Sequence, residues 1–502
     1  MPRFDRRPGH RITFVVLCAG VTAFSLLQSF VLPVLPTIQR SLGTDQRTVT
    51  WVLTAYLLSA SVFTPIVGRI GDKVGKERML VVALGALALG SLVAALATSI
   101  EVLVLARVVQ GIGGGVLPLT FGIIRDEFPP ERVAGAIGTA ASLLAVGGGL
   151  GLVLAGPIVG TLSYHWLFWL PMIVTVAAAV AAHWWVPESP VRTPGRIDVR
   201  AAVLLSSWLV CLLLAISQGR IWGWTSAAIL ALLAGAVVLC AAWVASELRS
   251  DAPLIDMRMM RLPAVWTTNV VALLFGVGMY TFYAFLPQFL QTPERTGYGL
   301  GLSVTVSGLL LLPQSTATFL AGLASGRLAA RLGSKRVLVL GGALNTAGLL
   351  GLTLAHAELW QVLLWTVVNG LAFGLGFAAL SNLVVESVPA SQTGVASGMN
   401  ANIRTIGGAI GGAALGSVIT AGARPDGLPV EAGYTAAFAV LTATSLAACL
   451  LALLVPLRRT TSADGAGRTH PQPAAVPAGT RASAEHPPPG VGRSSSGPVG
   501  PC

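Results

Sequence analysis

The sequence predicts an all-α membrane protein that crosses the bilayer fourteen times. Only 10% of its 502 residues are charged and 54% are hydrophobic, whereas a soluble domain carries about 25% charged residues. Apolar runs of about 20 residues, the length that a helix needs to cross the hydrocarbon core, recur along the whole chain. We expect the spans at 12–35, 48–68, 79–98, 101–124, 134–159, 165–186, 199–217, 226–246, 264–290, 301–325, 336–355, 360–386, 398–420 and 433–456.

The first apolar run follows three basic residues, Arg3, Arg6 and Arg7, as in a secretory signal peptide. The run at 12–35 is too long for the apolar region of such a peptide, however, and no small-residue cleavage site closes it. We therefore interpret it as the first membrane span.

The positions of the basic residues predict the orientation of the spans. If the N-terminus is cytoplasmic, 25 of the 32 Lys and Arg residues lie in cytoplasmic segments and five lie outside. The remaining two, Arg107 and Arg404, lie within spans. Cytoplasmic loops of membrane proteins are enriched in Lys and Arg. We therefore expect both termini in the cytoplasm and the protein in the plasma (inner) membrane.

Two short segments between spans repeat one pattern, at 68–78 and 326–336. In each, a Gly precedes another Gly by seven residues, an Arg follows the first Gly, and further basic residues stand at matching offsets. Each segment would join the second and third spans of a six-span block by a loop. Two similar blocks can rock about a site near the membrane midplane and give alternating access.

The repeat predicts how the chain is divided. We expect a cytoplasmic segment at 1–11, a six-helix bundle at 12–190, two inserted spans at 191–250, a second six-helix bundle at 251–457 and a tail at 458–502. The tail is rich in Pro, Gly, Ser and Ala and has almost no large apolar residues. Such a composition cannot bury a core, so we expect the tail to be disordered.

Catalytic, metal-binding and nucleic-acid-binding patterns are not found in the sequence. The six His residues do not cluster at ligand spacing, and there is no Cys-His pair, Glu-x-x-His pair or Walker-type phosphate loop. A basic stripe with interleaved aromatic residues, as in a nucleic-acid interface, is also missing. We predict no catalytic residue, no metal, no cofactor and no nucleic-acid partner; a membrane-embedded enzyme or receptor is the alternative that these observations disfavour.

Four segments, in order and at the expected spans, resemble motifs of the major facilitator superfamily. They are 68–78, with its Gly, Asp and basic residues; 106–111, with an Arg, a Gln and a Gly; the Gly- and Pro-containing stretch 151–160; and 51–56, reading Trp-Val-Leu-Thr-Ala-Tyr. With fourteen spans, the chain is similar to the fourteen-span drug:proton antiporter branch. The resemblance covers about residues 10–457 and implies the major facilitator fold.

The resemblance implies that the first repeated segment is a conformational switch. Asp72 would lock the two halves together on the cytoplasmic side, since a carboxylate can meet a helix N-terminus or an Arg across the interface. A solvated loop acid is the alternative, and the basic residues around it can serve topology and lipid headgroups. The switch would comprise Gly68, Arg69, Asp72, Lys73, Gly75, Lys76 and Arg78.

The resemblance also implies proton coupling through Arg107, with Gln110 one turn away. Arg107 is costly inside a bilayer and tends to face the bundle interior, although it can also snorkel to an interface. The chain departs from the branch in the first span, because Leu27 stands where the branch has an Asp. Glu386 is the remaining acid that we consider for proton coupling.

Two further groups of residues are candidates. The resemblance implies a hinge in the fifth span, which would consist of Gly151, Gly156, Pro157 and Gly160. Polar and aromatic residues inside spans can line a cavity or hold helices together. The cavity candidates are Gln28, Tyr283, Gln288 and Arg404, of which Arg404 can alternatively snorkel.

From these observations we expect a secondary active transporter. Its function would be proton-coupled export of drugs or hydrophobic metabolites by alternating access, with a small-molecule substrate, protons and the lipid bilayer as partners and a monomer as the working unit. The alternative is an exporter of the same fold for an anionic or lipid-like endogenous metabolite, with a different coupling mode. The two intramembrane Arg residues without an embedded acid favour that alternative.

Overall fold

The computed structural model is a bundle of helices, fourteen of which are long and apolar enough to cross a membrane. It describes residues 10–189, 198–250, 253–422, 424 and 428–456. The predicted tail at 458–502 and most of the predicted segment at 1–11 lie outside these residues. The predicted number and type of spans are confirmed for the part of the chain that is described.

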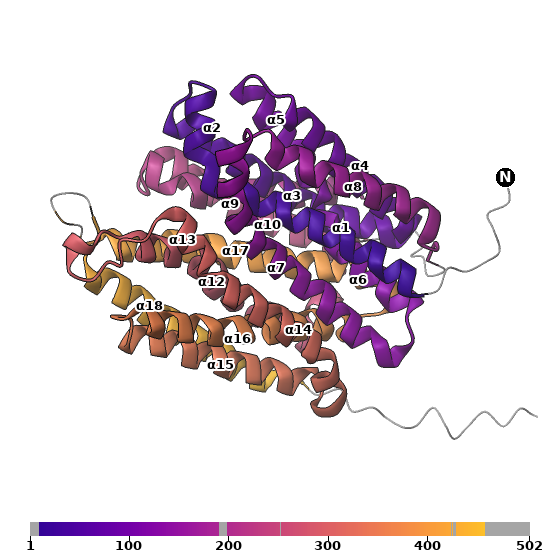
Figure 1. Ribbon diagram of the computed structural model, residues 1–502. Coiled ribbons are helices and arrows are strands. Elements are labelled where there is room, and N and C mark those ends of the chain that lie inside the picture. The colour runs from indigo at the N-terminus through magenta and orange to yellow at the C-terminus, as the bar shows by residue number, and fades with distance from the viewer. Residues whose placement is uncertain (1–9, 190–197, 251–252, 423, 425–427, 457–502) are drawn as a thin grey trace, which may run out of the picture. The chain divides into compact units, whose positions relative to one another are not determined.

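The helices of the first half are drawn in indigo to magenta in Figure 1 and those of the second half in orange to yellow. The first half comprises α1 (His10–Phe30), α3 (Gln46–Val74), α4 (Lys76–Ala95), α5 (Ile100–Gly111), α6 (Val116–Glu127), α7 (Pro130–Thr161) and α8 (Trp166–Trp185). Next come α9 (Val199–Trp222) and α10 (Ala227–Arg249). The second half comprises α12 (Pro263–Gln291), α13 (Val304–Leu309), α14 (Leu312–Leu332), α15 (Ser334–Leu354), α16 (Leu359–Ser387), α17 (Thr393–Thr420) and α18 (Glu431–Leu454).

The same helix pairs pack together in both halves. In the first half α1 contacts α7, α3 contacts α5, and α4 contacts α8. In the second half the corresponding pairs are α12 with α17, α14 with α16, and α15 with α18. This correspondence confirms two six-helix bundles, while the residue limits 12–190, 191–250 and 251–457 stay predictions.

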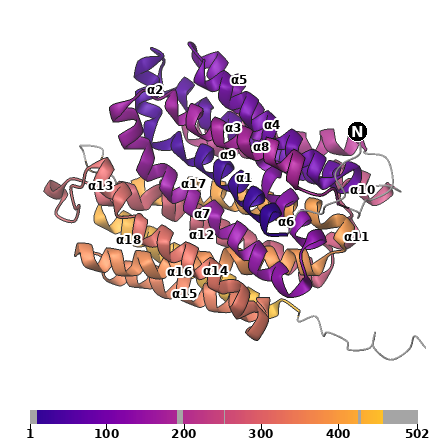
Figure 2. The same cartoon turned by 45° about the vertical axis from the view of Figure 1, so that its right-hand side comes forward.

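The two bundles meet along two seams. At one seam α3 packs against α17, and at the other α7 packs against α14. The inserted helices α9 and α10 pack against each other, and α9 also contacts α3 and α17 (Figure 2). The insertion therefore lies along the α3/α17 seam.

The first span ends earlier than the predicted limit at residue 35. Helix α1 stops at Phe30, and a 3-10 turn over Leu32–Val34 and the short α2 (Leu35–Ser41) follow. Proline lacks a backbone N–H and fits the first turn of a new helix rather than the interior of an old one. Pro33 stands at the start of that 3-10 turn, which accounts for the break.

The repeated segments are helical rather than loops, which corrects the sequence-based interpretation. Helix α3 runs through Asp72 to Val74, and α4 begins at Lys76. Only Gly75 breaks the helix, with a φ of 135°. In the second copy Gly333 breaks α14 from α15 with a φ of 82°. Glycine adopts positive φ without a steric penalty, so Asp72 occupies the last turn of α3 and not a solvated loop.

Candidate functional site

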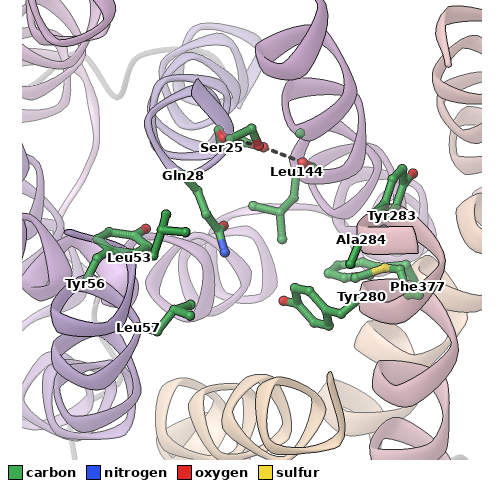
Figure 3. A pocket seen from close by; sticks show the side chains of 13 residues that line it. Ser25, Gln28, Leu53, Tyr56, Leu57, Leu144, Tyr280, Tyr283, Ala284 and Phe377 are labelled. Carbon is green, nitrogen blue, oxygen red and sulfur yellow. Dashed lines mark hydrogen bonds between the residues drawn. The ribbon is translucent and has the colours of Figure 1, made fainter. Parts of the chain in front are cut away.

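A cavity of about 240 Å³ lies between the two bundles (Figure 3). Helices α1, α3 and α7 line it from the first bundle, and α12 and α16 line it from the second. Its walls are mostly apolar and aromatic, and Gln28 projects into it from α1. The lining residues are Ser25, Gln28, Ser29, Leu53, Tyr56, Leu57, Leu144, Gly148, Met279, Tyr280, Tyr283, Ala284 and Phe377.

A smaller cavity of about 60 Å³ shares five of these lining residues and adds residues of α17. Among the added residues are Asn402 and Arg404. The amide of Asn402 donates to the backbone oxygen of Ser61 on α3, at 2.5 Å. The cation of Arg404 and the inter-bundle bond of Asn402 therefore both lie next to the larger cavity.

An arginine stacks on an aromatic ring at each wall. The Arg107 guanidinium lies 4.1 Å from the centre of the Tyr56 ring. The Arg404 guanidinium lies 4.2 Å from the centre of the Phe377 ring. Tyr56 lines the cavity from the first bundle and Phe377 from the second. Such stacking is favourable because a ring face carries partial negative charge.

Arg107 is wholly buried inside the first bundle. Its Nε donates to the backbone oxygen of Val52 at 3.1 Å, and Nη1 donates to Oε1 of Gln110 at 2.6 Å. Gln110 in turn donates to the hydroxyl of Ser91 at 2.9 Å. The Nη2 group of Arg107 has no hydrogen-bond partner among the described residues. Arg107 therefore faces the bundle interior and does not snorkel.

Arg404 is also buried, with 4% of its surface exposed. Nη1 lies 3.5 Å from Oδ1 of Asn400, and Nε has no hydrogen-bond partner among the described residues. Among the residues that the structure describes, no Asp or Glu lines either cavity. The two buried cations are therefore held by neutral groups and aromatic rings.

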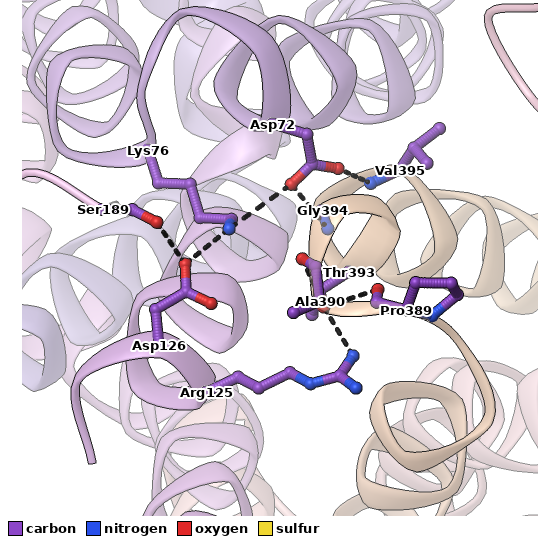
Figure 4. Close-up of polar contacts among 10 residues, drawn as sticks. All are labelled: Asp72, Lys76, Arg125, Asp126, Ser189, Pro389, Ala390, Thr393, Gly394 and Val395. Carbon is purple, nitrogen blue, oxygen red and sulfur yellow. Dashed lines mark hydrogen bonds and ion pairs between the residues drawn. The ribbon is translucent and has the colours of Figure 1, made fainter. Parts of the chain in front are cut away.

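At one end of the bundles Asp72 connects α3 to the beginning of α17 (Figure 4). Its Oδ1 accepts from the backbone N–H of Gly394 at 3.2 Å, and its Oδ2 accepts from that of Val395 at 3.1 Å. These N–H groups belong to the first turn of α17, where the helix dipole favours a negative charge. We call this end of the bundles, at which α3 ends and α17 begins, the Asp72 end.

Lys76 supports Asp72 from its own bundle and pairs with a second carboxylate, that of Asp126. The Lys76 ammonium lies 3.8 Å from Oδ1 of Asp72 and 2.5 Å from Oδ2 of Asp126. The hydroxyl of Ser189, after α8, donates to the same carboxylate oxygen of Asp126. Lys76 therefore offsets two buried negative charges.

Arg125, on α6, makes a second connection between the bundles at this end. Its guanidinium donates to the hydroxyl of Thr393 at 2.8 Å (Figure 4). It also donates to the backbone oxygen of Val388 at 2.8 Å. Together with the Asp72 contacts, these bonds join the first bundle to the end of α16 and to the beginning of α17. The Asp72 end is closed by charge-assisted hydrogen bonds.

Comparison with known proteins identifies the family. The model of the Major Facilitator Superfamily matches residues 17–299 and 268–488. The chain belongs to the Major Facilitator Superfamily. Members of the superfamily are transporters, and this chain is a transporter that spans the membrane.

The names of relatives in the superfamily refer to transport, export, efflux or resistance. The tetracenomycin C resistance and export protein of Streptomyces glaucescens is 28% identical over 408 residues, which cover 80% of this chain and 75% of that protein. The probable actinorhodin transporter of Streptomyces coelicolor is 30% identical, covering 80% and 71%. The multidrug efflux pump LfrA of Mycolicibacterium smegmatis is 28% identical, covering 88% of both chains.

A solved structure shows the same fold. The human organic anion transporter MFSD10 (TETRAN) superposes with a TM-score of 0.67 at 18% sequence identity, covering 89% of this chain and all of that one. At this identity the likeness concerns the fold alone. It agrees with the two-bundle arrangement described above.

The remaining residues of the predicted switch lie around Asp72. Gly68 packs against Gly394, and Nη2 of Arg69 donates to the backbone oxygen of Pro253 at 2.9 Å. Arg78 forms an ion pair with Glu188 at 3.1 Å. Lys73 is half-buried in the last turn of α3.

Three of the four cavity candidates line a cavity. Gln28 lines both, Tyr283 the larger and Arg404 the smaller. Gln288 is exposed and lines neither. Leu27, which stands in place of the branch's acid, is wholly buried beside Gln28.

The candidates for proton coupling do not come together. Arg107 and Gln110 share a hydrogen bond inside the first bundle. Glu386 is exposed near the end of α16, where it accepts from the hydroxyl of Ser334 at 2.6 Å. Ser334 begins α15, so Glu386 belongs to the end of the bundle and not to a cavity.

The hinge candidates lie on α7, which continues as one helix through Pro157. A Cβ atom added to Gly151 would lie 2.7 Å from the Cβ atom of Ser29, so Gly151 permits close packing on α1. Gly156, Pro157 and Gly160 are exposed near the end of the helix. Whether this segment bends during transport stays a prediction.

Several residues of the site were missing from the candidates. Tyr56 belongs to the quoted segment 51–56, and this membership was the signal in the sequence that could have identified it. Tyr280 stands one turn before Tyr283 on the same helix. Phe377 and Arg125 carry no pattern in the sequence that marks them.

Proposed function

We propose that this transporter exports drugs or hydrophobic metabolites by alternating access, driven by the proton gradient. The observation that carries the proposal is the largely apolar cavity between the bundles, lined from both of them, above an end that inter-bundle contacts hold closed. The names of the relatives, with resistance, export and efflux among them, support the direction of transport.

Closure and opening of the Asp72 end would alternate during transport. Opening requires Asp72 to leave the N–H groups of Gly394 and Val395, and Arg125 to leave Thr393. Each hydrogen bond to a charged group contributes about 1.5–3 kcal/mol. A few such bonds can hold one state without trapping it, because a bound substrate can offset this amount by favouring the other state.

The orientation and the working unit are part of the proposal. The bias of Lys and Arg supports a cytoplasmic Asp72 end, with both termini in the cytoplasm and the protein in the plasma (inner) membrane. The cavity and both seams are built within one chain, which supports a functional monomer.

Proton coupling is the part of the proposed function that has the fewest candidate residues. Antiport needs a titratable group that both sides can reach in turn. The described carboxylates lie near the two ends of the bundles, and none lines a cavity. Within the proposal, Glu386 and the Arg107–Gln110 pair are the candidates.

A specific observation favours a second candidate function. Arg404 stands beside the cavity without a carboxylate among the residues that line it. An exporter of an anionic or lipid-like metabolite, coupled in another way, would use that charge directly. The membrane potential acts on a charged substrate with about 2.3 kcal/mol per charge per 100 mV.

Efflux from cells that make the protein tests the proposal. A lipophilic dye is loaded, and its efflux is followed with and without a protonophore, beside cells that make an Asp72→Asn protein. We expect the wild type to export the dye faster than Asp72→Asn and to lose this efflux with the protonophore. If cells with the wild type in their membrane export the dye no faster than cells that lack the protein, export of hydrophobic compounds is contradicted. Efflux that survives the protonophore contradicts proton coupling alone.

A further inference from the structure

We propose that the cavity is a binding site for planar aromatic anions, with Arg404 as the counter-charge and the rings of Tyr56 and Phe377 as the aromatic walls. This inference rests on the proposed function, because it assigns a substrate class to the same cavity. It favours one part of the second candidate function, the anion, over a lipid-like compound.

The first argument is the uncompensated charge of Arg404. The side chain is buried at the edge of the smaller cavity, and its Nε lacks a hydrogen-bond acceptor among the described residues. A buried charge without a counter-charge is strongly unfavourable. An anion in the cavity would supply both the missing charge and the missing acceptor.

The second argument is that a positively charged guanidinium lies against the aromatic ring at each wall of the cavity. Arg107 covers one face of the Tyr56 ring, and Arg404 covers one face of the Phe377 ring. A ring face is electron-rich and a ring edge carries partial positive charge. Because a guanidinium already occupies one face of each ring, the two walls suit an electron-rich or anionic guest better than a cationic one.

A hydrogen-bond donor stands at the same wall. The hydroxyl group of Tyr56 is buried and has no partner among the described residues, although its side chain lines both cavities. A phenol can donate to an oxyanion and thereby satisfy a buried polar group. The charge of Arg404 and this donor therefore face one space from opposite bundles.

The third argument is the missing negative charge. A cation of substrate size would need a carboxylate, and none of the described carboxylates lines either cavity. Between like charges at low dielectric the repulsion is far larger than in water. The cavity is therefore expected to discriminate against lipophilic cations.

The walls favour an aromatic compound over a lipid chain. Tyr56, Tyr280, Tyr283 and Phe377 all line the larger cavity, on two facing bundles (Figure 3). Aromatic rings gain from offset or edge-to-face contact with other rings, beyond the burial of area. A flexible acyl chain would not use that geometry.

Two dyes with the same three-ring scaffold and opposite charge test the inference. Binding of fluorescein, anionic at pH 8, and of rhodamine 123, cationic, is measured by fluorescence polarisation with the full chain in nanodiscs, with empty nanodiscs subtracted. We expect fluorescein to bind at least tenfold more tightly than rhodamine 123. The Arg404→Gln variant should lose at least tenfold in fluorescein affinity and none for rhodamine 123.

Two further variants separate charge from folding. Arg404→Lys keeps the charge and should retain part of the fluorescein affinity, while Arg331→Gln removes a charge from the exposed last turn of α14 and should change neither affinity. Only variants that elute as the wild type does from gel filtration are compared.

The inference is overturned if fluorescein does not bind, if rhodamine 123 binds as tightly as fluorescein, or if Arg404→Gln leaves fluorescein binding unchanged. Its failure is distinct from failure of the proposed function. Anion-selective binding without efflux contradicts export and supports the site, whereas proton-driven efflux of rhodamine 123 with tight binding supports export and contradicts the site.

Discussion

Gly68 on α3 and Gly394 on α17 pack backbone against backbone, so that a Cβ atom added to Gly68 would lie 2.6 Å from the carbonyl oxygen of Gly394. The second copy of the repeat shows the same relationship at the other seam. Its first glycine, Gly326 on α14, packs against Gly135 on α7. The repeated glycine is thus a point of close backbone approach at each seam.

Replacing Gly68 by Val should keep the Asp72 end from closing. The added side chain would overlap the backbone of α17, which cannot move aside without separating the helices. We expect efflux to fall at least tenfold, measured as the initial rate with equal amounts of protein in the membrane.

Gly85→Val, in α4 of the same bundle, is the matched control. A Cβ atom at Gly85 meets nothing within 4 Å, so this variant should transport as the wild type does. Equal loss of efflux in both variants would show that added bulk, and not the seam, is responsible.

Asp72→Asn should open the same end without adding bulk. The amide cannot accept at both oxygen positions, so at least one bond to the N–H groups of Gly394 or Val395 is lost. A charge-assisted bond of about 1.5–3 kcal/mol corresponds to about a tenfold or larger shift in the equilibrium. Alkylation of a cysteine at the buried Ser397, with the native cysteines replaced, measures this shift as a rate.

In that assay Glu131→Gln removes an exposed acid at the beginning of α7 and should leave the alkylation rate as it is. The assigned role of Asp72 is wrong if its replacement leaves Ser397→Cys as protected as before.

Arg125 and Thr393 should be coupled across the seam. Arg125→Gln removes the bonds to the Thr393 hydroxyl and to the Val388 carbonyl, whereas Thr393→Val removes only the first. We expect each single variant to raise the alkylation rate of Ser397→Cys. Arg125→Gln should raise this rate more than Thr393→Val does. The double variant should resemble Arg125→Gln alone, since contacting residues are not additive. Full additivity would contradict a direct interaction.

Arg107 should be needed for the stability of the first bundle. Arg107→Gln leaves the carbonyl of Val52 and Oε1 of Gln110 without their donor, at about 1–3 kcal/mol for each buried group. Arg107→Lys should not restore stability, because an ammonium cannot stack on Tyr56 and reach two acceptors at once. A thermal unfolding midpoint as high as that of the wild type in either variant would contradict this role.

Glu386→Gln should retain most of the transport. The side chain is exposed at the end of α16, and its contact with Ser334 can be kept by an amide oxygen. Efflux is measured at an imposed proton gradient and again after its collapse. If the variant loses the response to the gradient while still moving dye, Glu386 is the coupling residue after all.

The number and approximate place of the spans could be predicted, because apolar length alone decides whether a helix can cross a membrane. The residues at which the spans begin and end were predicted less accurately. Asp72 was expected in a loop, although nothing before Gly75 breaks the helix. The Pro after Phe30 was available as a stop signal and would have shortened the first span.

Helical geometry could also have corrected one cavity candidate. Tyr283 and Gln288 are five positions apart, about 140° around a helix of 3.6 residues per turn. Both cannot face one cavity, and the structure has Tyr283 in the wall and Gln288 exposed. Tyr280, three positions before Tyr283, shares its face.

Contacts between helices that are distant in sequence could not be predicted. The stacking of Arg107 on Tyr56 depends on the approach of α5 to α3, and that of Arg404 on Phe377 depends on the approach of α17 to α16. An Arg in an apolar span indicates a buried partner, but the choice among many neutral partners is made by packing.

The inserted helices α9 and α10 shield one of the two seams between the bundles from the bilayer and leave the other without such a cover. Helix α9 lies against both α3 and α17, whereas no such helix pair accompanies α7 and α14 in the part of the chain that the structure describes. A compound dissolved among the acyl chains therefore meets a barrier of protein on one flank and only the α7/α14 boundary on the other. Uptake from a membrane leaflet would be one-sided, and it would pass the glycines at which those two helices touch.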